Sequence, residues 1–375
     1  MRVLFVISGL ALGGAERQVV VLSRELARLG HQVSIYTLTR ETPRIDELAG
    51  TDVEVLVDQK RQRLDFGVLG RLRRHIRRWR PDIVHGFLYD GDFYSRLAGW
   101  GMRVPVLNSE RSDKYQLALV QDIGYRLTSM LCDGVVANSY AGAEFARRLH
   151  RLPQEKVSVV WNGIDLQEVD ARLARSPQPA RQIFPGSGLK RLCMVGSIQP
   201  GKDHRLALRV VRQLIDDDPS WRLICVGDAP AQFREYKAQV LAERDRLRLE
   251  AFVEFPGNRR DVPEIMASSD LLLVTSVNEG FPNVVLEAMA CGTAVVSTDY
   301  SDVRRILPLP EQVVGSRAES EIAAAVVLCY GGRAGLARAQ RRWVEQHATA
   351  PASAAALLAV YARYVAPFAI APAAR

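Results

Sequence analysis

The chain has 375 residues, 48% of them apolar and 25% charged, which is typical of a soluble globular protein with two domains. No run reaches about 18 uninterrupted apolar residues and the N-terminus lacks the order of a signal peptide, so we expect a cytoplasmic protein. The five cysteines lie far apart without a CxxC pair, which argues against a metal site built on them.

The first half of the chain alternates short apolar runs with amphipathic segments. Residues 2–7 form a continuous apolar run, a loop with Gly13 and Gly14 follows, and the next helix is predicted to end at Gly30. Further strands are expected at 32–36, 53–57, 82–86, 104–107 and 134–137, with helices at 69–79, 93–101, 117–131 and 141–149. This alternation predicts a doubly wound parallel sheet.

Much of the net charge of +8 comes from the arginine-rich segment Lys60–Arg80. Its apolar residues recur at helical spacing, so the segment could lie on acidic lipid headgroups or could equally be a solvated helix face. Nucleic acid fits poorly, because no helix-turn-helix, RNP or zinc-finger pattern accompanies the charge. The side chains that would face an anionic membrane are Arg71, Arg73, Arg74, Arg77 and Arg78.

Residues 172–188 are irregular and rich in Pro and Gly, which is the composition of an interdomain linker. Strands and helices then alternate again from residue 191. We therefore expect an N-terminal domain at 1–175, a linker at 176–189, a C-terminal domain at 190–350 and a last helix within 351–375.

The stretch after the apolar run Leu271–Val274 carries the strongest chemical signal. The run indicates a buried strand, and Pro282 suits the first position of a following helix. The free amides of residues 283–285 would form an anion site suited to a phosphate. Glu287 lies on the same helix face, where a carboxylate can accept both hydroxyl protons of a ribose, and Glu279 falls in the loop before the helix.

Residues 279–287, EGFPNVVLE, resemble the donor-nucleotide motif of glycosyltransferase family 4, a family of retaining enzymes with the GT-B fold. The GGAE element at 13–16 and KVSVVWNGID at 156–165 resemble the same family, so the likeness covers nearly the whole chain. It implies two Rossmann-like doubly wound parallel-sheet domains facing a cleft, an N-terminal domain for the acceptor, a C-terminal domain for the nucleotide sugar, and a last helix that crosses back to the N-terminal domain.

The resemblance also implies donor-binding residues. Lys202 matches the lysine that neutralises the donor diphosphate, while Ser197 replaces an arginine that many relatives carry five residues earlier. Lys202 and Glu279, which the resemblance places at the transferred sugar, are the catalytic candidates. The donor-binding candidates are Gly13, Gly14, Ser197, Lys202, Gly227, Asn258, Arg259, Glu279, Gly280, Phe281, Pro282, Asn283, Val284 and Glu287.

Relatives often carry two histidines after the strand at 82–86; His85 matches the first and Phe87 takes the place of the second. A front-face mechanism needs no histidine base, because the leaving phosphate oxygen can accept the proton of the acceptor. His85 is also readily interpreted as a packed strand-end residue. With Asp90, Asp92 and Arg111, expected in loops at the carboxyl ends of strands, it completes the acceptor-binding candidates.

Asp90-Gly91-Asp92 spells the DxD triplet of the metal-dependent GT-A glycosyltransferases. A GT-A enzyme would not need the second Rossmann-like unit or the element from Glu279 to Glu287. We therefore expect no metal and no cofactor, the nucleotide sugar being a substrate.

Together these features predict a retaining, metal-independent glycosyltransferase. It would move a hexosyl group from a nucleotide sugar to a saccharide or lipid-linked acceptor, in surface polysaccharide or glycolipid synthesis. If the arginines bind lipid, the protein would be peripheral on the inner face of the cytoplasmic membrane. Two alternatives stay open: a nucleotide-sugar 2-epimerase of the same fold, and a non-catalytic GT-B subunit, which Ser197 and Phe87 favour.

Overall fold

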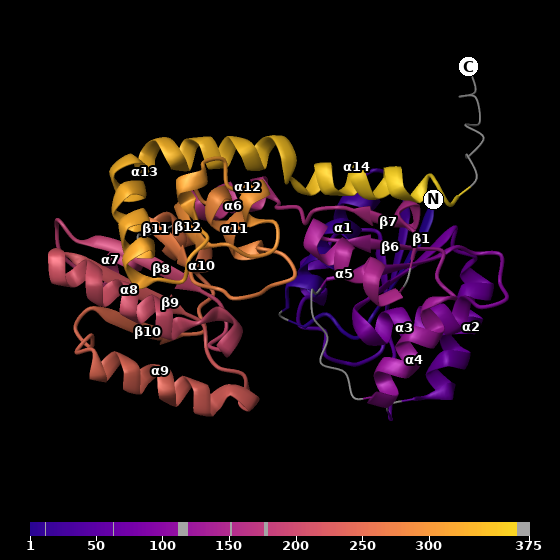
Figure 1. Ribbon diagram of the computed structural model, residues 1–375. Helices are drawn as coiled ribbons and strands as arrows, with labels where there is room; N and C mark the ends of the chain where they lie inside the picture. Colours follow the sequence, from indigo (N-terminus) through magenta and orange to yellow (C-terminus); the bar gives the residue numbers. More distant parts are fainter. Residues whose placement is uncertain (12, 63, 112–118, 151, 176–178, 366–375) are drawn as a thin grey trace, which may run out of the picture. The chain divides into compact units, whose positions relative to one another are not determined.

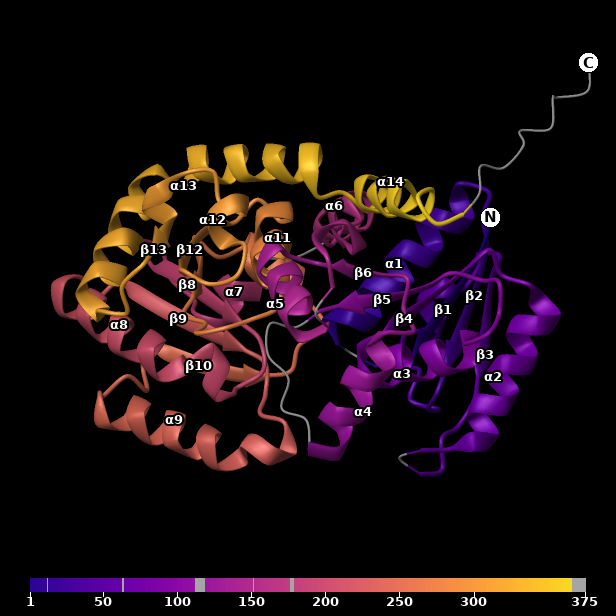
Figure 2. The ribbon, with the colours of Figure 1, turned by 45° about the vertical axis from the view of Figure 1, so that its right-hand side comes forward.

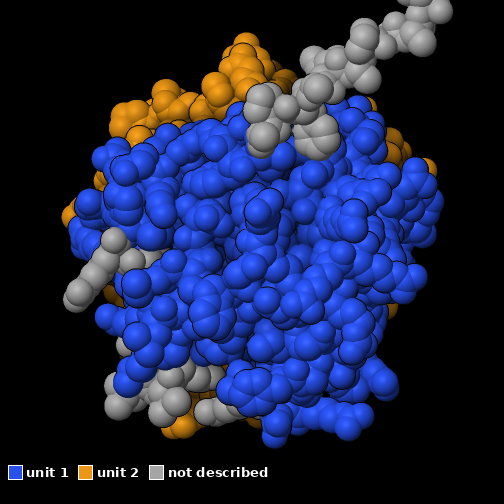
Figure 3. Space-filling view, turned by 90° about the vertical axis from the view of Figure 1, so that its right-hand side faces the viewer, with its two compact units in different colours: residues 1–163, 350–375 blue, residues 164–349 orange. Residues whose placement is uncertain are grey.

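The computed structural model describes residues 1–375 except 12, 63, 112–118, 151, 176–178 and 366–375. The chain divides into two compact units (Figure 1): unit 1 is Met1–Gly163 with Ala350–Arg375, and unit 2 is Ile164–Thr349. Figure 3 shows the surface of unit 1 in blue.

The division falls at residue 163, not at the expected 175. Ile164 pairs with Thr349 of unit 2, which draws the following residues into that unit. The segment expected to be a linker contains helix α7 (Pro179–Ile183), in which Ala180 is fully buried and its amide donates to Ser268 Oγ at 3.1 Å.

The described residues of unit 1 form a seven-stranded parallel sheet. In spatial order its strands are β3 (Val53–Val57), β2 (Gln32–Thr37), β1 (Arg2–Ile7), β4 (Ile83–Phe87), β5 (Val106–Glu110), β6 (Gly134–Ala137) and β7 (Val157–Val159). The helices are α1 (Gly14–Arg28), α2 (Phe66–Trp79), α3 (Leu88–Gly99), α4 (Leu119–Ser129), α5 (Tyr140–His150) and α14 (Ala350–Tyr361), with 3₁₀ turns at Ile45–Leu48 and Gln154–Lys156.

Strand β1 shows why its sequence is apolar without interruption. Successive side chains of a strand point to opposite faces, so a strand covered on both faces needs apolar residues throughout. Val3, Phe5 and Ile7 join the core cluster that contains residues of α1 and α14, whereas Leu4 and Val6 join the cluster that contains residues of α2 and α3. Helices therefore cover both faces of the sheet.

The C-terminal helix α14 belongs to unit 1 and packs against α1 (Figure 1). Leu357, Val360 and Tyr361 are buried in the same cluster as Phe5 of β1. The last described helix thus completes the core that the first strand begins.

The described part of unit 2 forms a six-stranded parallel sheet. In spatial order its strands are β10 (Val253–Gly257), β9 (Trp221–Val226), β8 (Lys190–Val195), β11 (Leu271–Val274), β12 (Ala294–Thr298) and β13 (Val313–Val314). The helices, with α7, are α6 (Leu166–Leu173), α8 (His204–Asp217), α9 (Arg234–Arg246), α10 (Val262–Ala267), α11 (Asn283–Ala290), α12 (Val303–Ile306) and α13 (Glu319–His347), with 3₁₀ turns at Pro200–Lys202, Ala231–Phe233 and Pro310–Gln312. The predicted fold class, two doubly wound parallel sheets, is confirmed.

Helix α13 bends sharply about midway in both ribbon views (Figures 1 and 2). Gly331, Gly332 and Gly335 fall in this part of the helix, and glycines are a common cause of such bends. By length and composition alone α13 would suit a membrane span. Its inner residues, including Ile322 and Val326, pack in the core of unit 2.

Candidate active site

Two loops at the carboxyl ends of β8 and β11 are joined by hydrogen bonds in unit 2. Thr275 Oγ1 donates to the carbonyl oxygens of Lys202 and Asp203, at 2.9 and 3.0 Å. The amide of Val277 donates to the carbonyl of Gly201 at 2.8 Å. Because Thr275 is fully buried, the chain from residue 275 onward is fixed against the loop that carries Lys202.

Lys202 and Glu279 form an ion pair, with 2.7 Å between Nζ and Oε1. Their side chains are only 12% and 18% exposed, and Ser276 Oγ donates to the same oxygen of Glu279. The two catalytic candidates are therefore in contact in this structure. Any phosphate that binds Lys202 has to share its charge with Glu279.

Helix α11 begins one residue later than expected, with Pro282 as its N-cap and Asn283 as its first residue. The amide of Asn283 donates to Phe281 O at 2.9 Å and that of Val285 to Pro282 O at 3.1 Å. Within the described chain, the amide of Val284 has no hydrogen-bond partner. Of the three backbone amides predicted to bind an anion, those of residues 283–285, only the amide of Val284 is left to donate to one.

Glu287 is half-buried on α11, one helical turn after Asn283 and Val284, so it shares a face with the helix start. In the loop before the helix, Phe281 is buried and Gly280 O accepts from Ser301 Oγ at 3.0 Å. The donor-binding candidates of residues 279–287 thus lie together at the carboxyl end of β11.

Two glycines bring the ends of β8 and β9 into close contact. Gly196 and Gly227 have φ of +143° and +131°, a region that side chains rarely adopt. A Cβ on Gly227 would lie 2.2 Å from Gly196 O, and one on Gly196 would lie 2.9 Å from Lys202 Cε. The glycines allow the loop with Ser197 to pass directly beside Lys202.

Arg317 is a cation at this site that the sequence analysis missed. Its guanidinium donates to Asp203 Oδ2 at 2.5 Å and to the carbonyl of Thr275 at 3.1 Å. It lies in the loop between β13 and α13. Its charge is already paired with Asp203, so it braces the Lys202 loop rather than replacing the arginine absent at Ser197.

The two remaining donor candidates of unit 2 lie after β10. Asn258 is exposed, and Arg259 forms a two-point ion pair with Asp261, with contacts of 2.8 and 2.7 Å. The contact of Asn258 and Arg259 with a nucleotide base stays a prediction.

In unit 1, Gly13 is the N-cap of α1 and Gly14 is its first residue. A Cβ on Gly13 would lie 2.2 Å from Glu16 Oε2, so the carboxylate of Glu16 folds back over this glycine. Burial raises the pKa of Glu16. In this structure the missing side chain of Gly13 therefore leaves room for the carboxylate of Glu16. Contact of Gly13 and Gly14 with the donor stays a prediction.

His85 is not placed to contact an acceptor. It is completely buried, its Nδ1 lies 2.6 Å from the hydroxyl of Tyr361 on α14, and its ring packs edge-on against Phe5. Burial holds the pKa of the imidazole well below its usual range. His85 is a core residue that fastens α14 to β4.

Asp90 and Asp92 do not lie in a loop, because α3 begins at Leu88, directly after the strand. Asp90 Oδ2 pairs with Lys60 Nζ at 2.6 Å. Asp92 is 1% exposed, and its carboxylate accepts from Tyr125 Oη at 2.6 Å and Asn108 Nδ2 at 2.9 Å. The two carboxylates have separate partners in this structure, and Asp92 is a buried structural residue.

Arg111, by contrast, follows β5 at the carboxyl edge of the sheet, where a ligand can bind. Its Nε donates to Ser109 Oγ at 2.8 Å, its Nη1 donates to Asn162 Oδ1 at 2.5 Å, and its guanidinium lies 5.1 Å from the ring centre of Phe87. Burial lowers its pKa to about 10, so it remains charged at neutral pH.

Comparison with known proteins identifies the two units. Residues 12–168 match the family model described as Glycosyltransferase Family 4, and residues 189–331 match the model described as Glycosyl transferases group 1. The chain belongs to glycosyltransferase family 4. This confirms the family resemblance of the EGFPNVVLE element and identifies the protein as a glycosyltransferase.

Its curated relatives include proteins named D-inositol 3-phosphate glycosyltransferase. The one from Thermobispora bispora is 28% identical over 330 residues, 78% of this chain and 75% of that protein. The one from Streptosporangium roseum is 27% identical over 334 residues, 78% of this chain and 74% of that protein.

Solved structures confirm the GT-B fold of the transferase. Anabaena HepE, crystallised with UDP, has a TM-score of 0.82 at 19% identity, over 96% of this chain and 99% of that one. The lipopolysaccharide outer core galactosyltransferase WaaB has a TM-score of 0.71 at 15% identity, over 97% of this chain and 100% of that one.

The arginines of α2 in the transferase are not equivalent. Arg71 forms a two-point ion pair with Asp58, both contacts being 2.8 Å, and Arg73 Nη1 donates to the carbonyls of Ala98 and Trp100. The guanidinium groups of Arg71 and Arg73 are therefore already bonded to residues of unit 1. The remaining three are exposed and have no partner among the residues described: Arg74, Arg77 and Arg78.

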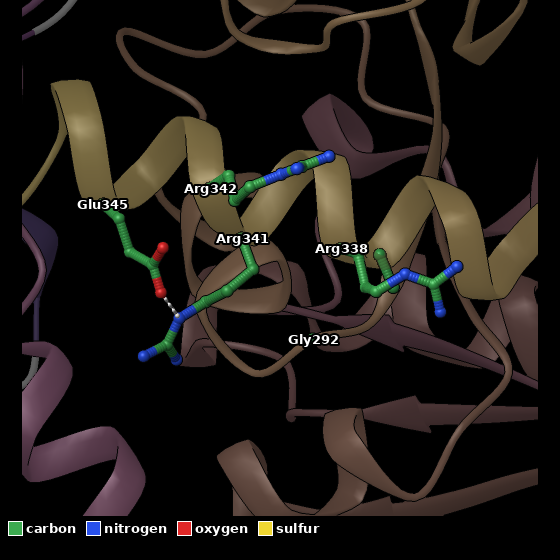
Figure 4. A pocket seen from close by; sticks show the side chains of 6 residues that line it. Gly292, Arg338, Arg341, Arg342 and Glu345 are labelled. Carbon is green, nitrogen blue, oxygen red and sulfur yellow. Dashed lines mark hydrogen bonds and ion pairs between the residues drawn. The ribbon is translucent and has the colours of Figure 1, made fainter.

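A cavity of about 390 Å³ lies beside Gly292, at the opposite end of α11 from Asn283. Figure 4 shows Arg341 turned toward Glu345, whereas Arg338 and Arg342 extend the other way from α13. Arg341 also donates to the carbonyl of Ala290, at the C-terminal end of α11. The cavity is thus separate from Lys202, and Arg341 holds the far end of the donor-site helix.

Proposed function

We propose that the transferase moves a sugar from a nucleotide-sugar donor to a saccharide or lipid-linked acceptor, with retention at the anomeric carbon. The observation that carries the proposal is the Lys202–Glu279 pair, held beside the start of α11 with Glu287 on the same helix. That HepE was crystallised with UDP and with UDP-glucose supports a nucleotide-sugar donor.

Each group at this site has a chemical task in the proposal. Lys202 and the open amide of Val284 would neutralise the diphosphate, and Glu287 would accept the ribose hydroxyls. Glu279 would hold the transferred sugar. The leaving phosphate oxygen then accepts the proton of the acceptor while the oxocarbenium-like sugar lies between them, so no separate base is required.

We propose that this transfer needs no metal ion. The carboxylates of the DxD triplet support this, since Asp92 is buried and Asp90 is paired with Lys60. Turnover should be equal with and without EDTA. Loss of activity on chelation, restored by magnesium or manganese, would refute this part of the proposal.

The function is tested in two steps. A thermal-shift screen of nucleotide sugars should find a donor, because a ligand at about 100 times its dissociation constant adds about 2.7 kcal/mol of stability. Incubation with that donor and candidate acceptors, followed by NMR of the product, should show an unchanged anomeric configuration. Conversion of the donor without any acceptor would instead identify a nucleotide-sugar epimerase.

We propose further that unit 1 attaches to the inner face of the cytoplasmic membrane, where it would meet a lipid-linked acceptor. The exposed arginines of α2 support this, since each basic residue near an anionic surface contributes about 1 kcal/mol. Vesicles with acidic lipid should sediment the protein at low salt and release it at high salt.

The structure gives this experiment a matched control. Changing Arg74, Arg77 and Arg78 to Gln should abolish sedimentation, whereas Arg71→Gln removes an arginine already paired with Asp58 and should change sedimentation little. Failure of the wild-type protein to bind acidic vesicles would mean that α2 is only a solvated surface.

A further inference from the structure

Arg96 is a buried arginine of unit 1 and Arg111 is a half-buried one, and their surroundings differ. Arg96 is 0% exposed and lies in a network with a carboxylate, because Asn108 bonds both its Nε, at 2.6 Å, and Asp92, at 2.9 Å. Its positive charge is therefore balanced within the core. Its Nη2 has no hydrogen-bond partner among the described residues, but Arg96 is fully enclosed and no ligand can reach it in this structure.

Arg111 has only neutral groups within hydrogen-bond distance. Ser109, Asn162 and the Phe87 ring surround its guanidinium. Among the residues described, no carboxylate lies within ion-pair distance of it; Asp92 and Glu110 act on it only at longer range. Even partial burial of a cation beside neutral groups alone costs free energy of hydration, so a fold that keeps such a cation has a use for its charge.

The geometry leaves part of the guanidinium available. The hydrogen bonds of Nε and Nη1 fix the plane of the group against Ser109 and Asn162, while Nη2 donates to none of the described residues. A fixed guanidinium that still has donors matches the paired oxygens of a phosphate.

Asn138 supplies an independent observation at the same edge of the sheet. Its side chain is 3% exposed, and its Oδ1 is buried with no partner in the structure as described. The backbone N–H of Asn138 donates to Glu110 O at 3.1 Å, which places Asn138 beside the residue that precedes Arg111. A side-chain oxygen of this kind can accept a hydrogen bond from a hydroxyl group of a ligand.

We propose that Arg111 and Asn138 form an acceptor subsite for a phosphate-bearing, hydroxylated molecule, with Arg111 on the phosphate and Asn138 on a hydroxyl. This rests on the proposed transferase function and names the class of its acceptor: a phosphorylated polyol or sugar. The diphosphate of the nucleotide-sugar donor could also supply the phosphate that binds Arg111. The test therefore has to distinguish an acceptor phosphate from the donor diphosphate.

Calorimetry on the full chain can do so with four probes: D-inositol 3-phosphate, unphosphorylated inositol, inorganic phosphate and UDP. Arg111→Gln should weaken binding of inositol phosphate and of inorganic phosphate by about tenfold or more, the usual effect of losing a charged hydrogen bond. Binding of inositol and UDP should change less than about twofold. Arg74→Gln, which removes one exposed charge, is the control and should leave all four unchanged.

A second readout separates a ligand site from a structural role. Because no described carboxylate pairs with Arg111, Arg111→Met should leave the melting temperature of the ligand-free protein unchanged or raised. Loss of an arginine with a structural role would lower the melting temperature. Arg111→Lys keeps the positive charge but loses the paired N–H donors of the guanidinium, so it should retain part of the phosphate affinity.

Two results would overturn the subsite. One is equal affinity of wild type and Arg111→Gln for inositol phosphate and inorganic phosphate. The other is a loss confined to UDP, which would assign the anion to the donor. Neither result would affect the proposed function itself, which fails only if the wild-type protein transfers no sugar from any nucleotide sugar.

Discussion

Replacing Glu279 by Gln should make the transferase bind free UDP more tightly while it transfers sugar more slowly. In the structure Glu279 holds Lys202 at 2.7 Å in a place where both side chains are mostly buried. A bound diphosphate has to compete with this carboxylate for the lysine. Removing the negative charge leaves the lysine free for the phosphate.

The expected gain in UDP affinity can be estimated from the ion pair between Lys202 and Glu279. A partly exposed ion pair contributes up to about 1 kcal/mol, and that amount released to the diphosphate corresponds to about fivefold tighter binding. Turnover should fall by about a hundredfold, because the proposed contact of Glu279 with the transferred sugar is lost in the transition state. Affinity and turnover therefore change in opposite senses.

Calorimetry with UDP and steady-state kinetics with the donor measure the two effects. Lys202→Met should weaken UDP binding, and in the Glu279→Gln/Lys202→Met double variant the gain from Glu279→Gln should vanish, because no lysine is left to release. Ser276→Ala, which removes only the hydrogen bond to Glu279, is a milder control. Weaker UDP binding by Glu279→Gln would show that the carboxylate itself contacts the nucleotide, and the competition argument would be refuted.

Three further predictions concern stability and can be measured by urea unfolding. Gly227→Ala should cost about 3 kcal/mol or more, because its Cβ would meet Gly196 O at 2.2 Å with φ at +131°, whereas Gly292→Ala, at φ +72° with open space around it, should cost about 1 kcal/mol. Equal costs would contradict the close approach. Tyr361→Phe removes the 2.6 Å hydrogen bond to the buried imidazole of unit 1 and should cost about 1 to 3 kcal/mol while UDP affinity stays unchanged. Burial raises the pKa of Asp92 to about 6, above its value in an unfolded chain. Wild type should therefore gain up to about 3 kcal/mol relative to Asp92→Asn as pH falls from 7 to 4, and a constant difference would contradict the raised pKa.

Local signals in the sequence were sufficient for much of the fold. Leu271–Val274 is a strand because a parallel strand covered on both faces needs four apolar residues in a row, and Gly292 follows α11 because only glycine readily adopts its φ of +72°. Strand β11 and the two ends of helix α11 were therefore placed to within one residue.

Contacts between distant residues could not be read in the same way. The bond between His85 and Tyr361 joins positions 276 residues apart, and nothing near His85 in sequence indicates a hydroxyl partner. Asp92 was expected in a loop because it lies between the predicted strand at 82–86 and the predicted helix at 93–101. The preceding Gly91 in fact lies in α3, where a Cβ would meet Val6 O at 2.3 Å. The glycine serves helix–strand packing, and no local pattern distinguishes that use from a turn.

The return of α14 to unit 1 has a consequence for how the chain is made. Translation delivers the first 163 residues early, but Leu357, Val360 and Tyr361, which complete their core, emerge only after the whole of unit 2. Domains generally fold as their residues leave the ribosome, so the contiguous unit 2 can close first. Until then the N-terminal segment of unit 1 has its face for α14 uncovered. A premature stop after Thr349 would leave unit 2 whole and damage unit 1, whose first 163 residues had been made long before.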